Sequence, residues 1–322
     1  MKTAIGIDIG GTKISLALGN AQGKILAQRR LDTLTGASTS ACLGQLQEAV
    51  KSLAAEARKK RHRVSGIGIG VPGPVDSRSG KVPRSPHLAG WKGVPLKRLL
   101  EKASGVPVIM ANDANAAAVA ERIFGQGKGC ESFVYMTVST GIGGGIYTGG
   151  SLLEGVNFVA GEIGHMIIVP EGNLCRCGNR GCLEAYSSGT AIAQYAESQV
   201  RKGKRTVLSD RMARQGRLSA KDVGEAAQKK DGVALKAYEK AGYYLGIGIA
   251  NILNILNPEK VILGGGVWQS APVRFHRFMM QSCRHHAWPE AFEKVKIVRS
   301  KIKGSVGDLG ALALVFEKVV QP

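Results

Sequence analysis

The sequence predicts an α/β fold with two lobes of similar plan. Apolar runs of strand length alternate with helical segments along the chain, which is the pattern of α/β proteins. The runs at 3–9 and 133–138 are each followed by a glycine-rich turn and a returning strand, so the second half repeats the plan of the first. With 322 residues, the chain is long enough for two such lobes with a cleft between them.

The first lobe is expected to begin with a hairpin and to continue with alternating helices and strands. Its expected strands are 3–9, 12–18, 24–30, 64–71 and 106–111. A helix over 43–57 follows from apolar residues at spacings of three and four. An alanine-rich helix follows Asn112-Asp113 and stops at Gly125. We place this lobe at 1–117.

The second lobe is expected to cover 118–305, and the C-terminal segment 306–322 is expected to join the first lobe. The expected elements are a strand at 133–138, a glycine turn at 139–145, a returning strand at 146–148, a helix at 233–256, a strand at 260–263 and a closing helix at 306–319. The long helix ends at Asn257-Pro258, because proline does not continue a helix.

Composition restricts the class of protein. The net charge of +20 would suit polyanionic partners, but the basic runs 58–63 and 201–205 contain no Phe, Tyr or Trp, so we expect solvated surfaces and no nucleic-acid site. The N-terminus lacks a signal-peptide pattern, and the longest apolar stretch, 245–256, is too short to span a membrane. The six cysteines fit a reducing compartment. We therefore expect a soluble cytoplasmic protein that does not bind membranes.

One histidine and three cysteines have the spacing of a metal site: His165, Cys175, Cys177 and Cys182. Thiolates and imidazole are the ligands that Zn²⁺ prefers, and four of them close its tetrahedral shell without leaving a position for a catalytic water. We therefore predict a structural zinc ion. Glu162 and Glu184 flank this segment. The zinc site either holds these carboxylates toward a polar ligand or only stabilises a loop.

Three glycine-rich loops, at 10–13, 139–145 and 264–266, predict a ligand with several phosphate groups. Glycine lets backbone N–H groups approach an anion closely, although each loop alone is equally consistent with an ordinary turn. The sequence has no Walker A loop. A dinucleotide fingerprint occurs at 68–73, but Pro72 would spoil the helix that should start there, so we exclude a nicotinamide enzyme.

Two acidic positions lie at the ends of expected strands. Asp8 is a candidate Mg²⁺ ligand, directly or through water, or else a turn residue that bonds its own backbone. Asn112-Asp113 lies where a strand passes into a helix. Asp113 is a candidate base that accepts a hydroxyl proton, with Asn112 orienting that hydroxyl, or else the pair only caps the helix.

Taken together, these motifs resemble the ROK family of sugar kinases and sugar-responsive repressors. The matching segments follow the family's order: Asp8-Ile-Gly-Gly-Thr-Lys13, Gly70-Val-Pro-Gly-Pro-Val-Asp76, Asn112-Asp113-Ala-Asn115, Thr140-Gly-Ile-Gly-Gly-Gly145, Gly161-Glu-Ile-Gly-His165 and Cys175-Arg-Cys-Gly-Asn-Arg-Gly-Cys182. The resemblance implies an actin-like, ribonuclease-H-like fold whose two lobes close on ATP and a hexose. It also implies Mg²⁺, a structural zinc ion and a homodimer.

The resemblance implies a role for each matching residue. Asp113 would be the general base for the sugar 6-hydroxyl. The implied sugar contacts are Gly73, Asn112, Asp113, Glu162, His165 and Glu184. The implied ATP contacts are Gly6, Asp8, Gly10, Gly11, Thr12, Lys13, Thr140, Gly141, Gly143, Gly144, Gly145 and Gly265. The implied metal ligands are His165, Cys175, Cys177 and Cys182 for zinc, and Asp8 for magnesium.

The resemblance also indicates a substrate. The segment 85–88 (Ser-Pro-His-Leu), followed by Gly90-Trp91, is similar to the glucokinase members, which more often carry Asn where His87 stands. We therefore expect glucose as substrate, with N-acetylglucosamine or N-acetylmannosamine as alternatives, and polyphosphate as an alternative donor. A non-catalytic sugar sensor is the alternative from another class. The repressor branch carries an additional N-terminal DNA-binding domain, which we do not expect here because the first strand begins at residue 3.

Overall fold

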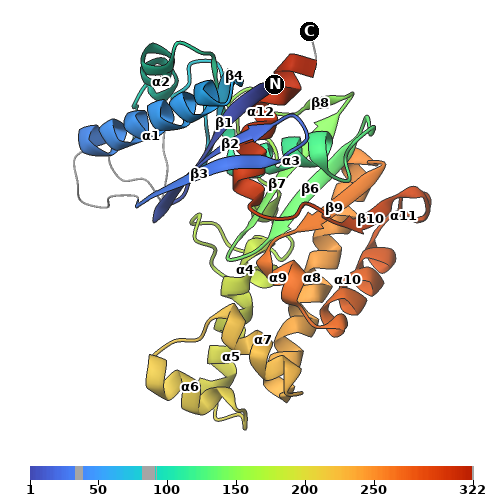
Figure 1. Cartoon of the computed structure of the whole chain (residues 1–322). Helices are drawn as coiled ribbons and strands as arrows, with labels where there is room; N and C mark the ends of the chain where they lie inside the picture. The colour runs from blue at the N-terminus through green and yellow to red at the C-terminus, as the bar shows by residue number, and fades with distance from the viewer. Residues whose placement is uncertain (33–38, 82–90, 92, 321–322) are drawn as a thin grey trace. The chain divides into compact units, whose positions relative to one another are not determined.

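The computed structural model describes residues 1–32, 39–81, 91 and 93–320 (Figure 1). The segment 85–90, on which the expectation of glucose partly depends, lies outside these residues. The chain divides into two compact units. Unit 1 comprises Met1–Glu131, Gly145–Gly161 and Ser300–Pro322, and unit 2 comprises Ser132–Gly144 and Glu162–Arg299. Among the described residues, no helix is both long and apolar enough to cross a bilayer.

The two sheets have the same strand order, as the repeated sequence plan predicts. The first is β3-β2-β1-β4-β5, and the second, read from β8, is β8-β7-β6-β9-β10. Its strands are β6 (Phe133–Val138), β7 (Ile142–Thr148), β8 (Ser151–Leu152), β9 (Lys260–Gly264) and β10 (Lys296–Arg299). β7 starts at Ile142, so the expected glycine turn over 139–145 is too long: Gly143, Gly144 and Gly145 belong to the strand. The α/β fold class is confirmed.

The first sheet lies entirely in unit 1. Its strands are β1 (Lys2–Ile9), β2 (Lys13–Asn20), β3 (Ile25–Asp32), β4 (Arg63–Val71) and β5 (Val108–Asn112). β1, β2 and β3 are antiparallel, whereas β4 and β5 run parallel to β1. The carboxyl ends of β1, β4 and β5 therefore meet at one edge of the sheet, which is where α/β proteins place their ligands.

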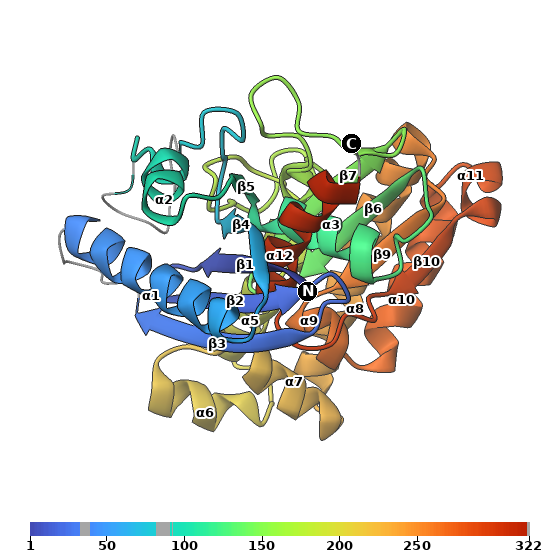
Figure 2. The same cartoon turned by 45° about the horizontal axis from the view of Figure 1, so that its top comes forward.

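The two faces of this sheet differ because side chains alternate along each strand. Ile5, Ile7 and Ile9 belong to a core that includes Leu46 and Val50 of α1 (Thr39–Lys59). The opposite face is covered by α12 (Val306–Val320), shown in red in Figure 2.

Glycines in β1 and β4 let α12 lie close to the sheet. A Cβ atom on Gly68 would lie 1.8 Å from the carbonyl oxygen of Ala311, and one on Gly6 would lie 2.9 Å from that of Asp308. The remaining helices of unit 1 are α2 (Leu96–Ser104) and α3 (Asp113–Phe124).

Helices make up most of unit 2. Its elements besides the strands are η1 (Ile163–His165), α4 (Glu184–Ser187), α5 (Gly189–Arg201), α6 (Leu208–Gln215), α7 (Ala220–Gln228), α8 (Gly232–Leu256), α9 (Gly266–Ser270), α10 (Val273–His286) and α11 (Pro289–Lys294). α8 packs on α10 through Gly242 and Gly246, where a Cβ atom would lie 2.4 Å from the carbonyl oxygens of Phe275 and Met279.

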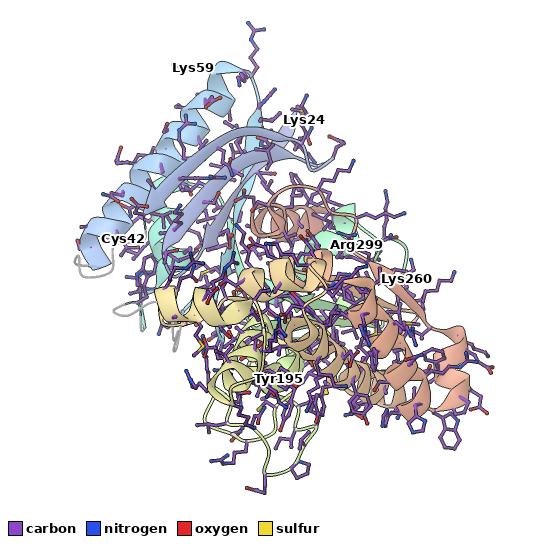
Figure 3. The ribbon with its side chains drawn as sticks, turned by 90° about the horizontal axis from the view of Figure 1, so that it is seen from below. Lys24, Cys42, Lys59, Tyr195, Lys260 and Arg299 are labelled. Atoms are coloured by element: carbon purple, nitrogen blue, oxygen red, sulfur yellow. The ribbon has the colours of Figure 1, made fainter. Side chains whose placement is uncertain are left out.

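The basic charge is distributed over exposed positions. The run that ends α1 is solvated, and Figure 3 shows the Lys59 side chain extending away from the helix. Lys60 pairs with Glu56 one helical turn before it, at 3.1 Å. Such exposed pairs contribute little to stability.

The division of the chain into lobes at residue 117, which the sequence predicts, differs from its division into two compact units in the structure. Both assign the C-terminal helix to the part that contains the N-terminus. The compact unit also includes residues 118–131 and 145–161, which the division at residue 117 assigns to the second lobe.

Candidate active site

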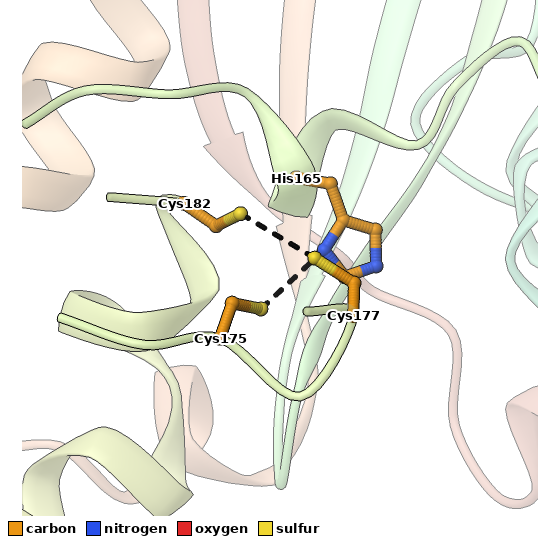
Figure 4. Close-up of side chains that lie close together, drawn as sticks. All are labelled: His165, Cys175, Cys177 and Cys182. Carbon is orange, nitrogen blue, oxygen red and sulfur yellow. Dashed lines mark hydrogen bonds between the residues drawn. The ribbon is translucent and has the colours of Figure 1, made fainter. Parts of the chain in front are cut away.

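The four predicted zinc ligands converge in unit 2 (Figure 4). Their donor atoms all lie within 4.8 Å of one another. The Sγ atoms of Cys177 and Cys182 are 3.6 Å apart, and Cys175 Sγ is 3.7 Å from His165 Nδ1. A tetrahedral zinc ion with bonds of about 2.3 Å to sulfur holds two sulfur ligands about 3.8 Å apart. The donor set and its spacing therefore fit zinc.

The local fold explains this convergence. Backbone hydrogen bonds from Cys175 to Asn179 and from Gly178 to Cys175 close a tight loop, and Gly178 adopts a φ of 97°, which favours glycine. Burial, followed by the neighbouring thiols, raises the pKa of Cys182 to about 12. A divalent cation opposes such a shift because it stabilises thiolates.

The geometry of His165 assigns different tasks to its two ring nitrogens. Nδ1 faces Cys175 Sγ, whereas Nε2 lies 3.9 Å from Glu162 Oε2 on the other side of the ring. If Nδ1 binds the metal, Nε2 carries the ring proton, and this N–H can donate a hydrogen bond to a carboxylate or to a ligand hydroxyl. Glu162 is exposed and His165 is half-buried, so both can reach a ligand.

Glu184 begins α4, two residues after Cys182, and contacts both the cysteine cluster and a glycine loop. Its Oε2 accepts a hydrogen bond from the backbone N–H of Ile142 at 2.8 Å. Its Oε1 is 3.9 Å from Cys175 Sγ. A Cβ atom on Gly141 would lie 2.4 Å from Glu184 Oε2, so a larger residue at this position would displace the carboxylate. This relationship was not predicted from the sequence.

The loop before β7 is held by the start of α5. The N–H of Gly189 donates to the carbonyl oxygen of Ser139 at 2.8 Å, and the hydroxyl of Thr190 donates to the carbonyl oxygen of Thr140 at 2.9 Å. Thr140 itself is exposed and Gly141 is half-buried. The loop is therefore fixed in position while part of its backbone remains accessible.

In unit 1, Asn112 and Asp113 have separate environments. Asn112 is the N-cap of α3: its Oδ1 accepts from the N–H groups of Ala114 and Asn115. Its Nδ2 donates to the carbonyl oxygen of Gly73 at 3.1 Å. Asn112 therefore caps α3 through its amide oxygen and bonds Gly73 through its amide nitrogen, while its role as a sugar contact stays a prediction.

Asp113 occupies the first helical position and is exposed. Its Oδ1 accepts from the N–H of Ala114 at 2.8 Å. It is not a buried cap, and its carboxylate is accessible to a ligand.

Asp8 is the penultimate residue of β1, at the same sheet edge. The Cα of Asp113 and the Oδ1 of Asp8 both lie 3.9 Å from the position that a Cβ atom would take on Gly70. Burial, followed by the negative charges of Asp308 and Asp113, raises the pKa of Asp8 from 3.8 to about 6. Carboxylates that destabilise one another in this way are stabilised by a cation, so the residues present fit a Mg²⁺ ion.

The glycines predicted to contact ATP differ in their surroundings. In the β1–β2 turn, the N–H of Gly10 donates to the carbonyl oxygen of Lys13 at 2.9 Å, and Thr12 and Lys13 are exposed. Gly6 is buried beneath α12, and a Cβ atom on Gly145 would lie 2.6 Å from Ala118 Cβ. These two glycines therefore have a packing role.

Gly265 has a φ of 93°, and a Cβ atom there would lie 2.3 Å from the carbonyl oxygen of Val138. Glycine is thus required at this position by backbone conformation and by close approach.

Sequence reasoning did not identify Asp308, which is fully buried at the start of α12. An acidic residue in the first turn of a helix is a common stabilising feature, so the sequence carries no signal that distinguishes it.

The repeated topology and the acidic edge of the first sheet place the chain among the α/β proteins of actin-like fold. The ROK family model matches residues 4–318, and the chain belongs to this family. A glucokinase of Halalkalibacterium halodurans is 39% identical over 264 residues, which are 82% of this chain and 80% of that protein.

Two further relatives show the range of the family. A xylose repressor of Caldicellulosiruptor bescii is 30% identical over 98% of this chain and 78% of its own length. The structure of a glucokinase from Streptomyces griseus in complex with glucose and AMPPNP superposes with a TM-score of 0.79 at 31% identity, covering 98% of this chain and 99% of that one. The chain is therefore homologous to sugar kinases.

Proposed function

We propose that the protein is a kinase that transfers a phosphoryl group from ATP to the 6-hydroxyl of a hexose, with glucose as the substrate. One observation carries this proposal: the exposed residue Asp113 and the Asp8 carboxylate both lie close to Gly70 at the carboxyl edge of the sheet of unit 1, since the Asp113 Cα and the Asp8 Oδ1 are each 3.9 Å from the Cβ position of Gly70. A proton acceptor and a cation-binding group at one edge are what phosphoryl transfer to a hydroxyl requires.

In this proposal, Asp113 accepts the proton of the sugar hydroxyl as the phosphoryl group is transferred. Its Oδ1 is oriented by the N–H of Ala114, which fixes the carboxylate with respect to α3. Asn112 and Gly73, which are joined by the bond from the Asn112 amide nitrogen to the Gly73 carbonyl oxygen, contact the sugar beside it. Glu162, His165 and Glu184 supply the remaining sugar contacts.

The nucleotide is proposed to bind through the glycine loops at 10–13 and 140–143, in which Thr12, Lys13 and Thr140 are exposed. Mg²⁺, when bound, neutralises phosphate charge, and Asp8 would hold it directly or through water. Zinc, when bound by His165, Cys175, Cys177 and Cys182, supplies rigidity and no open coordination position. ATP roles for Gly6, Gly145 and Gly265 remain predictions beside their packing roles.

The direct test is an ADP-release assay with glucose, mannose, N-acetylglucosamine and N-acetylmannosamine. We expect the highest kcat/KM with glucose and ATP. A higher kcat/KM with an N-acetylated sugar would show that this sugar, and not glucose, is the substrate, and would leave the assignment as a kinase unchanged. Polyphosphate replaces ATP in a parallel arm, with glucose 6-phosphate as the product that is measured. Light scattering of the same sample tests the proposed homodimer.

A sugar-responsive regulator is the second candidate, and the similarity to a xylose repressor favours it. Such a protein would bind a sugar at the zinc-linked carboxylates without transferring a phosphoryl group. Saturable sugar binding by calorimetry, combined with no ADP release for any sugar, would establish the regulator and exclude the kinase.

A further inference from the structure

Next to Asp8, on the face of the first sheet that α12 covers, lies a connected set of polar side chains that are half-buried or buried. Ser15 of β2 is the direct pairing partner of Asp8 in β1. Gln28 of β3 donates through Nε2 to Ser15 Oγ at 3.2 Å and to Asp308 Oδ2 at 2.7 Å. The set therefore connects β2 and β3 to the first turn of α12.

Asp308 is the least accessible member of this set. Its side chain is 0% exposed. Its one described side-chain partner, Gln28, is a neutral amide, and among the described residues Oδ1 has no hydrogen-bond partner. Burying a carboxylate costs free energy unless a positive charge or several hydrogen bonds compensate it.

The residue before Asp308 is in direct contact with Asp8. A Cβ atom on Gly307 would lie 2.0 Å from Asp8 Oδ2 and 2.9 Å from Asp8 Oδ1. The Asp8 carboxylate thus rests on the backbone of the α12 N-terminus, and only glycine permits this approach.

We propose that Asp308 is a positioning residue for the divalent cation held by Asp8. Its buried carboxylate, fixed by Gln28, adds negative charge next to Asp8, and the first turn of α12 fixes the Asp8 carboxylate. The inference rests on the proposed function, because it assigns a role in binding the metal–nucleotide complex.

A simpler interpretation is that Asp308 only stabilises α12. An acid in the first helical turn interacts favourably with the helix dipole, and the N–H of Asp308 donates to Ser305 Oγ at 3.2 Å. This interpretation predicts a loss of stability without a change in metal affinity. The two interpretations therefore differ in a measurable quantity.

The test uses Asp308→Asn, which keeps the shape of the side chain and an oxygen that can accept from Gln28. Mn²⁺ is titrated into the full-length protein with saturating ADP, and free Mn²⁺ is followed by electron paramagnetic resonance. We expect the Kd of Mn²⁺ to rise about tenfold, because a nearby negative charge is lost. Binding of metal-free ADP and of glucose should not change. An unchanged Mn²⁺ affinity would overturn the proposal.

Glu121→Gln is the matched control. Glu121 is also 0% exposed and lies in unit 1, but it bonds Ser300 and the N–H of Gln126. It should lose stability and keep its Mn²⁺ affinity, and equal losses of affinity in both variants would overturn the proposal. If Asp308→Asn does not fold, Gln28→Ala tests the same network. There we expect about a threefold weaker Mn²⁺ affinity, and no weakening contradicts the role.

ADP release by the unmodified protein separates this inference from the proposed function. A wild-type protein that binds Mn²⁺–ADP through Asp308 but phosphorylates no sugar would retain the inference and refute the kinase. An active kinase whose Asp308→Asn variant binds Mn²⁺ normally would support the proposed function and refute the role of Asp308.

Discussion

The carboxylate of Glu184 accepts a hydrogen bond from the backbone N–H of Ile142 at 2.8 Å. The same side chain approaches Cys175 of the zinc cluster. One residue thus connects the predicted metal centre to the predicted phosphate loop. A change in the loop should therefore affect sugar binding, even when no nucleotide is present.

Gly141→Ala tests this connection. The new methyl group would lie 2.4 Å from Glu184 Oε2, so the carboxylate must move. Because Glu184 is a proposed sugar contact, we expect the Kd of glucose, measured calorimetrically without ATP, to rise about tenfold. Gly266→Ala is the control, since its nearest neighbour, Ser139 Oγ, is 4.0 Å away. An unchanged Kd of glucose in Gly141→Ala would show that Glu184 is not a sugar contact.

Asp8→Asn should stabilise the metal-free protein at neutral pH. The pKa of Asp8 is raised from 3.8 to about 6, so the folded state binds more protons than the unfolded state between these values. Stability is therefore lost as the pH rises through this window, and Asn avoids the loss. We expect a gain of about 1–3 kcal/mol at pH 7.5 and little gain at pH 4.

Urea denaturation with EDTA at both pH values measures this effect. The same variant should lose most of its ADP release, because it lacks the proposed Mg²⁺ ligand. A pH-independent effect of Asp8→Asn on the free energy of unfolding would show that Asp8 does not carry the raised pKa.

Removal of one cysteine should release zinc and weaken sugar binding. Cys177 is the exposed member of the cluster, so Cys177→Ser removes a ligand at little packing cost. We expect one zinc ion per chain in the wild-type protein and less than half of that in the variant, measured by atomic emission. Cys130→Ala, a buried cysteine outside the cluster, should keep its zinc. Full zinc content in Cys177→Ser would exclude Cys177 as a ligand.

The sequence predicted the elements that have strong local signals. The alanines after Asn112-Asp113 predict a helix that stops at Gly125, and α3 covers Asp113–Phe124. The residue types and spacing of His165, Cys175, Cys177 and Cys182 predict the zinc ligands, because thiolate and imidazole donors at such separations are typical of zinc sites. The boundary of β7 was wrong because glycines in a buried strand carry no strand propensity.

Contacts between distant segments could not be predicted in this way. Gln28 and Asp308 are 280 positions apart, and their hydrogen bond depends on how α12 packs on the sheet. Gly6 and Gly68 leave the space in which α12 packs, but from the sequence alone these glycines could equally be ligand-binding positions. Only the structure distinguishes a glycine that allows a helix to pack closely from one that allows the backbone to approach a phosphate group.

Asp113→Asn is the decisive variant for the proposed chemistry. The amide keeps the size of the side chain and an oxygen that can accept from the N–H of Ala114, but it cannot take a proton. We expect kcat to fall about 10²- to 10⁴-fold while the Kd of glucose stays within about threefold. Asp210→Asn makes the same change at an exposed first-turn position of α6 and should leave kcat unaltered. If instead Asp113→Asn raised the Kd of glucose and kept kcat, Asp113 would be a sugar contact and the base would have to be another group.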